Sequence, residues 1–369
     1  MVLTNYWWLI IWLFSGGILL AYISFKQRQH VIGEKRNKWW FPSAILLVLP
    51  YVIWAGYRTD RYGDTYAYRA MFKAAPSRIS ELFSYVQNTE KDKGFSALMV
   101  LIKSIFGDSD IVFFLIIAII QMLCIVYIYQ KYSCNYWLSI FLFIASADYM
   151  SWMHNGMRQF LAVTISLISF EFLLRKRYVL VVGLILLATT VHASALLMLP
   201  AIFIIQGKAW GKKTICVLLA TLVVILMMDR FTNVMQMLLV DTQYSDVVTT
   251  WQSGGDDGAN PIRVLVYSIP TILSLIGLKE IRRKDNPIVN MAVNSGICAT
   301  GVFCVSIFTS GIFVGRLPIY FYLLSQGIAL PWLIENFFSK KSKYLVLIIT
   351  VIFYLIYFQY QMSITWKAI

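Results

Sequence analysis

The stretch YVLVVGLILLATTVHASALLMLPAIFII, residues 178–205, decides how this chain folds, because His192 is its only side chain that ionises near neutral pH. Basic residues flank it on both sides, at 175–177 and at 208–213. Loops rich in Lys and Arg lie on the cytoplasmic side of a membrane, so the run must cross the membrane an even number of times. It can turn back only at the polar segment TTVHAS, residues 189–194. Each arm then rises about 21 Å, short of a hydrocarbon core of about 30 Å, and we expect His192 slightly below the outer surface.

Composition places the whole chain among membrane proteins. Hydrophobic residues make up 59% of it and charged residues 14%, whereas a soluble domain is about 25% charged. Apolar runs of about 20 residues recur from end to end, each long enough to cross a bilayer as a helix. We predict an all-α polytopic integral membrane protein of about twelve transmembrane helices, at residues 6–25, 39–57, 110–129, 136–151, 157–174, 178–191, 193–206, 214–229, 262–279, 288–311, 317–334 and 344–362.

In a membrane protein, the net charge of +14 has an ordinary structural explanation. Basic residues gather in short loops between the spans, where they set orientation, so no nucleic-acid partner is expected. The five cysteines form no CxxC or Cys/His cluster, which argues against a disulfide framework or a zinc site. The pair Asp256-Asp257 lies in a glycine-rich loop, which indicates a solvated turn and not a metal site.

The same charge rule orients the rest of the chain. It leaves one short apolar segment, residues 94–107, as interfacial or re-entrant, because a crossing there would move every later basic loop to the outer side. Both chain ends are then external, as are two long segments at about 58–109 and 230–261. Long loops are often functional. We predict one transmembrane domain over residues 1–369.

The first external segment begins with alternating charges among tyrosines, AGYRTDRYGDTYAYRAMF at residues 55–72. Tyr68 and its neighbours can stack on sugar rings, while the carboxylates of Asp60 and Asp64 can accept hydrogen bonds from sugar hydroxyls. An interfacial aromatic belt with local ion pairs would look the same. A sugar site and a belt are both open from composition alone.

Arginines recur where predicted spans begin or end on the external side. Arg158 opens the fifth span, with Asn155 and Gln159 beside it. Three further arginines have similar settings: Arg58, Arg263 and Arg316. Each alone can simply extend to the membrane surface. Their shared level predicts binding of a polyanion such as pyrophosphate.

His192 has two readings. A polar group within a membrane segment is a functional-site hypothesis by default, and a histidine titrates close to working pH. Alternatively, the ring only bonds backbone groups that the turn leaves without partners.

Short motifs in this order resemble the EpsG-type and Wzy-type bacterial polysaccharide (O-antigen) polymerases. The motifs are AGYR at 55–58 running into GDT at 63–65, then Asn155 with Arg158-Gln159, and last HASA at 192–195. The resemblance covers roughly residues 55–200. Related sequences often have a second glycine before the Gly-Asp pair, where this chain has DRY at 60–62.

The resemblance implies a GT-C-like helical bundle and a membrane glycosyltransferase without a metal or other cofactor. Such an enzyme joins oligosaccharide units carried on undecaprenyl pyrophosphate at the outer face of the bacterial inner membrane. Donor and acceptor are both lipid-linked, membrane lipid surrounds the protein, and a chain-length regulator and a flippase are implied partners. His192, Asp64 and Arg158 are then the candidate catalytic residues. The candidate substrate or pyrophosphate ligands are Arg58, Arg158, Arg263, Arg316, Asp60, Tyr68, Asn155 and Gln159.

Other functions share these features. A flippase for the same lipid-linked oligosaccharide would bind it with the same arginines, although its charges should pass through the membrane centre. An O-antigen ligase would share both the arginines and the histidine. A non-catalytic scaffold in glycan export would not require His192.

Overall fold

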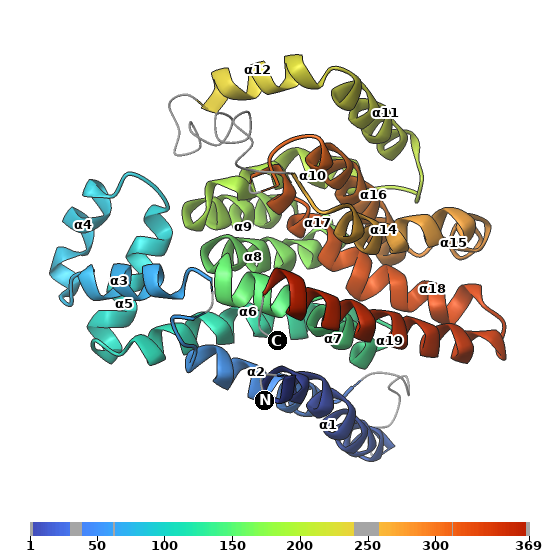
Figure 1. Ribbon diagram of the computed structural model, residues 1–369, viewed down its shortest axis with the longest axis horizontal. Coiled ribbons are helices and arrows are strands. Elements are labelled where there is room, and N and C mark those ends of the chain that lie inside the picture. The colour runs from blue at the N-terminus through green and yellow to red at the C-terminus, as the bar shows by residue number, and fades with distance from the viewer. Residues whose placement is uncertain (1–2, 30–38, 62, 240–257, 312, 367–369) are drawn as a thin grey trace. The chain divides into compact units, whose positions relative to one another are not determined.

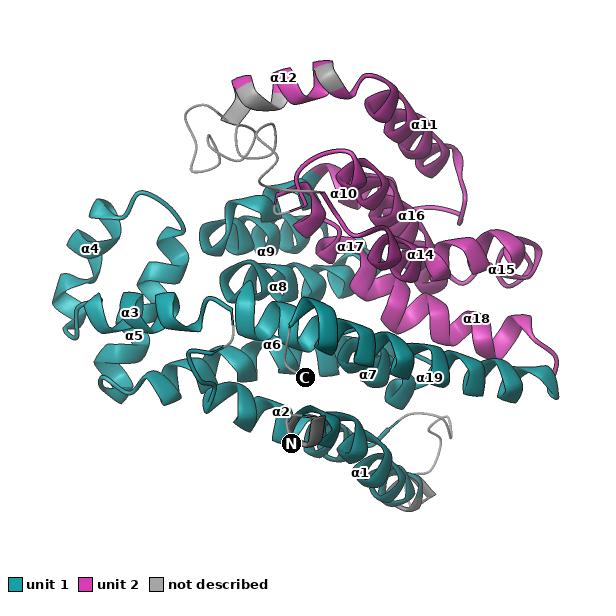
Figure 2. Cartoon of the chain, in the orientation of Figure 1, with its two compact units in different colours: residues 1–199, 340–369 teal, residues 200–339 magenta. Residues whose placement is uncertain are grey.

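A computed structural model describes residues 3–29, 39–61, 63–239, 258–311 and 313–366. Every regular element in these residues is helical. The chain divides into two compact units, residues 1–199 with 340–369 and residues 200–339 (Figure 2). The prediction of a single domain over 1–369 stays a prediction.

Unit 1 contains the amino-terminal helices and the carboxyl-terminal one (Figure 1). In order these are α1 (Leu3–Gln29), α2 (Phe41–Gly56), α3 (Thr65–Ala74), η1 (Ile79–Glu81), α4 (Leu82–Asn88), α5 (Lys93–Phe106), α6 (Asp110–Tyr132), α7 (Tyr136–Ala145), the π-helix η2 (Tyr149–Asn155), α8 (Met157–Leu174), α9 (Tyr178–Val191), η3 (Ala193–Leu197), α19 (Ser342–Tyr360) and η6 (Gln361–Thr365). Helix α10 (Met198–Ile205) crosses the boundary between the units.

Unit 2 is built around one long helix, α16 (Pro287–Ile307), which packs against α11 and α14. Its elements are α11 (Lys212–Leu226), α12 (Met228–Leu239), α14 (Pro261–Ile276), α15 (Leu278–Lys284), α16, η4 (Val314–Arg316), α17 (Ile319–Leu324), η5 (Ser325–Ala329) and α18 (Leu330–Phe337).

The prediction of a helical, multi-pass membrane protein is confirmed, and the count of twelve spans is not. Among the described residues, six helices are long and apolar enough to cross a membrane: Tyr6–Phe25, Asp110–Tyr132, Met157–Leu174, Pro287–Ile307, Val314–Phe337 and Ser342–Thr365. A seventh span results if α14 and α15, bent by 69°, are counted together. The other predicted spans are helices too, but shorter ones.

The core of unit 1 is the packing of α6 against α2 and α8, and of α8 against α9 (Figure 1). Far from the start of α8, the Glu171 side chain, only 4% exposed, fixes α8 against α6. It accepts hydrogen bonds from Lys131 at 2.7 Å and from Tyr132 at 2.6 Å, both near the end of α6. Arg175, one turn further along, also pairs with it. A buried carboxylate needs such partners, so this cluster sets the register of the two helices.

The first predicted external loop, at about 58–109, is not a loop. It is a layer of short helices, α3 to α5, that packs on α6 (Figure 1). Phe72 of α3 stacks on Phe113 of α6, with ring centroids 4.5 Å apart. Lys103 of α5 donates to the carbonyl of Lys73 at 2.7 Å and so closes the end of α3. The segment predicted as interfacial, 94–107, is α5, which packs on α4, α6 and α9 and buries one of its faces.

The second predicted external loop, 230–261, is only partly described. Helix α12 covers its beginning, and residues 258–260 lead into α14. The pair Asp256-Asp257 lies outside the described residues, as does the middle of the loop.

Candidate functional site

The Gly-Asp motif packs directly on the Asn-x-x-Arg motif. Gly63 has φ +54°, and a Cβ built on it would lie 2.7 Å from Oδ1 and 2.9 Å from Cα of Asn155. Only glycine fits a close approach in this conformation. The contact brings Asp64, exposed at the start of α3, beside the end of η2 and the first turn of α8.

Tyr68 connects α3 to Arg158. Its hydroxyl lies 3.5 Å from the Arg158 amide nitrogen, and the Arg158 guanidinium carbon lies 5.7 Å from the centre of its ring. The side chain is 5% exposed. Burial raises the pKa of Tyr68, and the positive charge of Arg158 opposes that rise. The phenol is therefore neutral at physiological pH, and its buried ring packs beside the guanidinium.

Asp92 bridges Arg158 to the turn that contains His192. One carboxylate oxygen accepts from Arg158 Nη1 at 2.7 Å, and the carboxylate also accepts from the backbone N–H of Ala193. Burial raises the pKa of Asp92, while Arg158 and Lys91 act to lower it. Sequence reasoning missed this residue. The one signal was its place in the external segment, directly before the amphipathic run that forms α5.

His192 closes α9 and begins η3 in extended conformation, with φ −155°. Its Nδ1 lies 2.7 Å from Ser194 Oγ and accepts from the Ser194 backbone N–H at 3.4 Å. The ring therefore caps η3, as the structural reading predicted, and it remains half-buried. Because α9 packs antiparallel to α8, the turn lies at the end of α8 that carries Arg158.

The same turn is in close contact with α5. A Cβ on Gly94 would lie 2.2 Å from Thr190 Oγ1. This contact and the Asp92 bridge join the helical layer α3–α5 to the His192 turn. In unit 1 the fold thus brings together Asp64, Tyr68, Arg158 and His192, with Asp92 between the last two.

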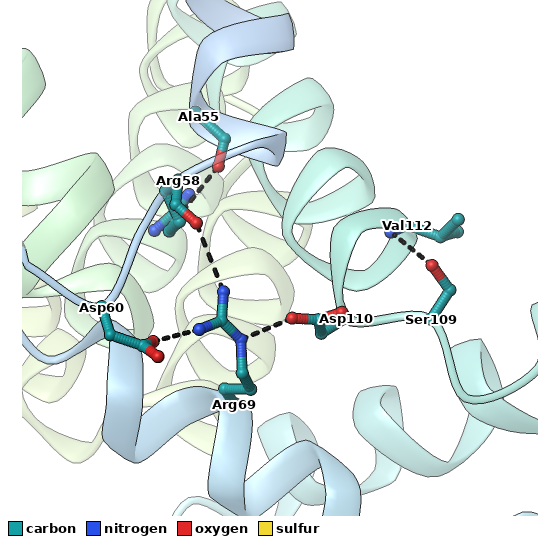
Figure 3. A network of polar contacts seen from close by, with 7 residues as sticks. All are labelled: Ala55, Arg58, Asp60, Arg69, Ser109, Asp110 and Val112. Carbon is teal, nitrogen blue, oxygen red and sulfur yellow. Dashed lines mark hydrogen bonds and ion pairs between the residues drawn. The ribbon is translucent and has the colours of Figure 1, made fainter.

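Asp60 does not face this group. It pairs with Arg69, whose guanidinium also bonds Asp110 and donates to the backbone carbonyl of Arg58 at 3.3 Å (Figure 3). Ser109 caps the start of α6 next to Asp110, accepting from Val112 N. Arg69 therefore links the chain after α2 to the start of α6.

Arg58, whose backbone carbonyl accepts from Arg69, is buried and only 3% exposed. Its Nε donates to Ala55 O at 2.6 Å, and its Nη1 bonds Met153 O. The guanidinium lies 4.5 Å from the centre of the Phe114 ring. Burial lowers the pKa of Arg58 to about 10, which leaves it charged at neutral pH. Arg58 thus ties the end of α2 to η2 and α6.

Two further residues near Arg158 point into the protein. Gln159 is 5% exposed in α8. His154 is fully buried between Trp54 and Tyr149, with ring centroids 4.9 and 5.1 Å away. Asn155 is half-buried against Gly63.

Arg263 and Arg316 belong to unit 2 and lie at one end of it. Ala259 N, just before α14, donates to Ser306 O at 2.8 Å, and a Cβ on Gly315 would lie 3.5 Å from Ala259. Arg263 extends over the rings of Tyr267 and Phe303, at 5.7 and 5.8 Å. Both arginine side chains are half-buried.

Within the described ranges, no group of three or more His, Cys, Asp or Glu side chains is arranged to hold a metal ion. The site in unit 1 offers a guanidinium at the first turn of a helix, an imidazole, and an exposed carboxylate. Such a set can bind an anion and accept a proton.

Comparison with known proteins gives one match. A family model described as EpsG family matches residues 42–366, a range that includes every candidate site residue. Neither a curated protein nor a solved structure matches the chain.

Proposed function

The chain belongs to the EpsG family, and on that premise we propose that it joins undecaprenyl-pyrophosphate-linked oligosaccharide units into O-antigen or exopolysaccharide chains. Membership implies a multi-pass membrane polysaccharide polymerase with glycosyltransferase-type activity. The lipid carrier, the outer-face location and the GT-C-like architecture are part of the proposal.

The proposed reaction breaks the bond between C1 of the donor sugar and the pyrophosphate oxygen. A hydroxyl of the acceptor sugar forms the new bond to C1, its proton passes to a base, and undecaprenyl pyrophosphate leaves with the bonding electrons. Negative charge develops on the leaving oxygen. Fixed donors aimed at such a position lower the barrier, and in the proposed reaction guanidinium groups supply this stabilisation.

One observation carries the proposal: Asp92 joins Arg158 to the His192 turn. A cation for the leaving group and a base for the acceptor must act on one C1 atom, so they have to be held in a fixed relation. The shared carboxylate provides that relation from two elements far apart in sequence. Tyr68 and the Gly63–Asn155 contact hold the other side of Arg158.

Each candidate then has a role in the proposal. Arg158 binds pyrophosphate, and Arg263 and Arg316 stay, as the sequence predicts, candidate anion ligands of unit 2. His192 receives the acceptor proton or orients the hydroxyl, and Asp64 binds sugar hydroxyls. The remaining candidates are assigned to positioning because they are buried or paired: Arg58, Asp60, Tyr68, Asn155 and Gln159.

Glycan analysis of a deletion strain tests this function. A polymerase deletion leaves a single repeat unit on the lipid core, and the chain-length ladder on a gel disappears. Loss of all repeats would instead indicate the flippase or the ligase. Complementation with the wild-type gene restores the ladder, and Arg158→Ala and His192→Ala should not. A full ladder from both variants would refute the proposed site while leaving the polymerase function standing.

Sidedness has its own test. A cysteine introduced at position 192 should react with a membrane-impermeant thiol reagent from the outer side. Labelling only from the cytoplasmic side would reverse the orientation. A chain-length regulator and a flippase are proposed as partners, and membrane lipid surrounds the helices.

A further inference from the structure

A basic cavity lies in unit 2, outside every residue assigned to the proposed reaction. Its volume is about 240 Å³, and three lysines line it: Lys208, Lys212 and Lys213. None of the described lining residues is acidic. Lys213 donates to Phe203 O at 2.7 Å, whereas Lys208 and Lys212 are exposed and form no ion pair with a residue that the structure describes.

Hydrogen bonds to α14 and α16 fix the loop that forms the cavity. Asn294 of α16, 1% exposed, donates to Ile205 O at 3.0 Å and accepts from Trp210 N at 3.2 Å. The Trp210 indole donates to Ser274 Oγ at 3.0 Å. Trp210 itself has φ +54°, an uncommon conformation that these bonds hold in place. The lysines are therefore presented by a fixed backbone, which reduces the ordering cost of binding.

The size of the cavity limits what it can hold. Sites for drug-sized ligands have volumes of about 300–1,000 Å³, and this cavity, at about 240 Å³, is smaller and has room for a phosphate group. The amide groups at the start of α11 add positive potential, since Gly211 gives that helix no side-chain cap.

Apolar surface continues from the cavity along α11. Phe203 is exposed, and along its length α11 exposes large apolar side chains: Ile215, Leu219, Leu222, Val223 and Leu226. A basic pocket beside apolar helix surface is the arrangement that binds anionic lipid head groups. We propose that this cavity binds the phosphate head group of an anionic membrane lipid, with the acyl chains along α11. The same chemistry would admit free phosphate, and the experiment separates the two.

The test uses the full chain in detergent with dioctanoyl phosphatidylglycerol, dioctanoyl phosphatidylcholine or inorganic phosphate as the probe. Binding is measured by native mass spectrometry and by the shift in melting temperature with ligand concentration. The variant is Lys208→Gln/Lys212→Gln. The matched control is Lys340→Gln/Lys341→Gln, an exposed lysine pair before α19.

The wild type should bind phosphatidylglycerol and not phosphatidylcholine. Near a lipid surface each lysine contributes enough to change affinity about 5-fold, so the double variant should bind about 25-fold more weakly. The control should bind as the wild type does. Binding of inorganic phosphate that the variant loses, without binding of phosphatidylglycerol, would overturn the lipid and retain an anion site. Equal binding by wild type and variant, or an equal loss in the control, would overturn the proposal altogether.

Discussion

The carboxylate of Asp92 accepts from Arg158 at 2.7 Å and from the backbone N–H of Ala193, directly after His192. Arg158 is 66 positions from Asp92 in the chain, and the sequences around the two residues are unlike each other. Their pairing makes one group of three separate elements, the loop before α5, the first turn of α8 and the turn after α9.

Replacing Asp92 by Asn should reduce polymerisation about 10- to 100-fold, because a charge-assisted bond worth about 1.5–3 kcal/mol is lost. The amide oxygen can still accept from Ala193, so the fold should survive. Turnover of lipid-linked donor by the purified protein measures the effect. Glu81→Gln, at an exposed carboxylate of the same helical layer, is the control and should remain active. Wild-type turnover in Asp92→Asn would remove the bridge from the mechanism.

Acidification should affect stability and activity in opposite directions. The pKa of Asp92 in the folded protein is raised above its ordinary value, so the folded state binds this proton more tightly than the unfolded state does. As pH falls through the raised pKa, the melting temperature of the wild type should therefore rise relative to that of Asp92→Asn. Turnover should fall over the same pH window, because protonation removes the charge that holds Arg158. A relative gain in wild-type stability with rising pH would contradict the sign.

Arg58→Met should destabilise the fold. It leaves the carbonyls of Ala55 and Met153 without their donor, at about 1–3 kcal/mol for each buried group. Thermal unfolding in detergent should show a clear drop in melting temperature. Arg61→Met, at an exposed arginine, should not. A stable but inactive Arg58→Met variant would instead favour direct contact with pyrophosphate.

Gly63→Ala and Gly107→Ala separate contact from conformation. Both glycines have positive φ, and Ala there costs about 1–2 kcal/mol. Only at Gly63 does the new Cβ meet another residue, Asn155, whereas nothing lies within 4 Å of it at Gly107. Melting temperature should fall further for Gly63→Ala, and only that variant should lose the long-chain ladder. Equal effects would mean that the two motifs do not depend on their contact.

His192→Asn distinguishes a cap from a base. An Asn side chain can accept from Ser194 N–H and keep the turn, but it cannot take up a proton. Its melting temperature should stay near that of the wild type, while His192→Ala should lose about 1 kcal/mol of stability. Turnover should fall at least about 100-fold in both variants. Normal turnover in His192→Asn would leave His192 only as the cap of η3.

Charge counting and hydropathy predicted the helical membrane class and the turn at His192, because both depend on local composition. They singled out residues 94–107, which form α5, as an interfacial segment, but they did not predict α3, α4 or the layer to which α5 belongs. The helices of this layer are short, and packing on α6 stabilises them more than intrinsic propensity does. A polar segment of this kind looks like a loop in sequence.

The candidate site shows the same limit. Arg58 and Arg158 look alike in sequence, since each lies at the end of an apolar run. Arg58 is buried because η2 places Met153 O against it, and no local pattern encodes that contact. The sequence does not single out Asp92, because a carboxylate in a polar segment looks like any solvated carboxylate until its partner is known.

The Glu171 cluster has a consequence for how the protein responds to its bilayer. Helices α6 and α8 are fixed to each other at this cluster, and again near the start of α8, where Gln121 donates to Met157 O at 2.9 Å. A pair joined at two levels cannot slide along its axis when hydrocarbon thickness changes. It accommodates mismatch by tilting as one body. Because α3 packs on α6 through Phe72 and Phe113 and Arg158 lies in the first turn of α8, we expect Tyr68 and Arg158 to keep their spacing in membranes of different lipid composition.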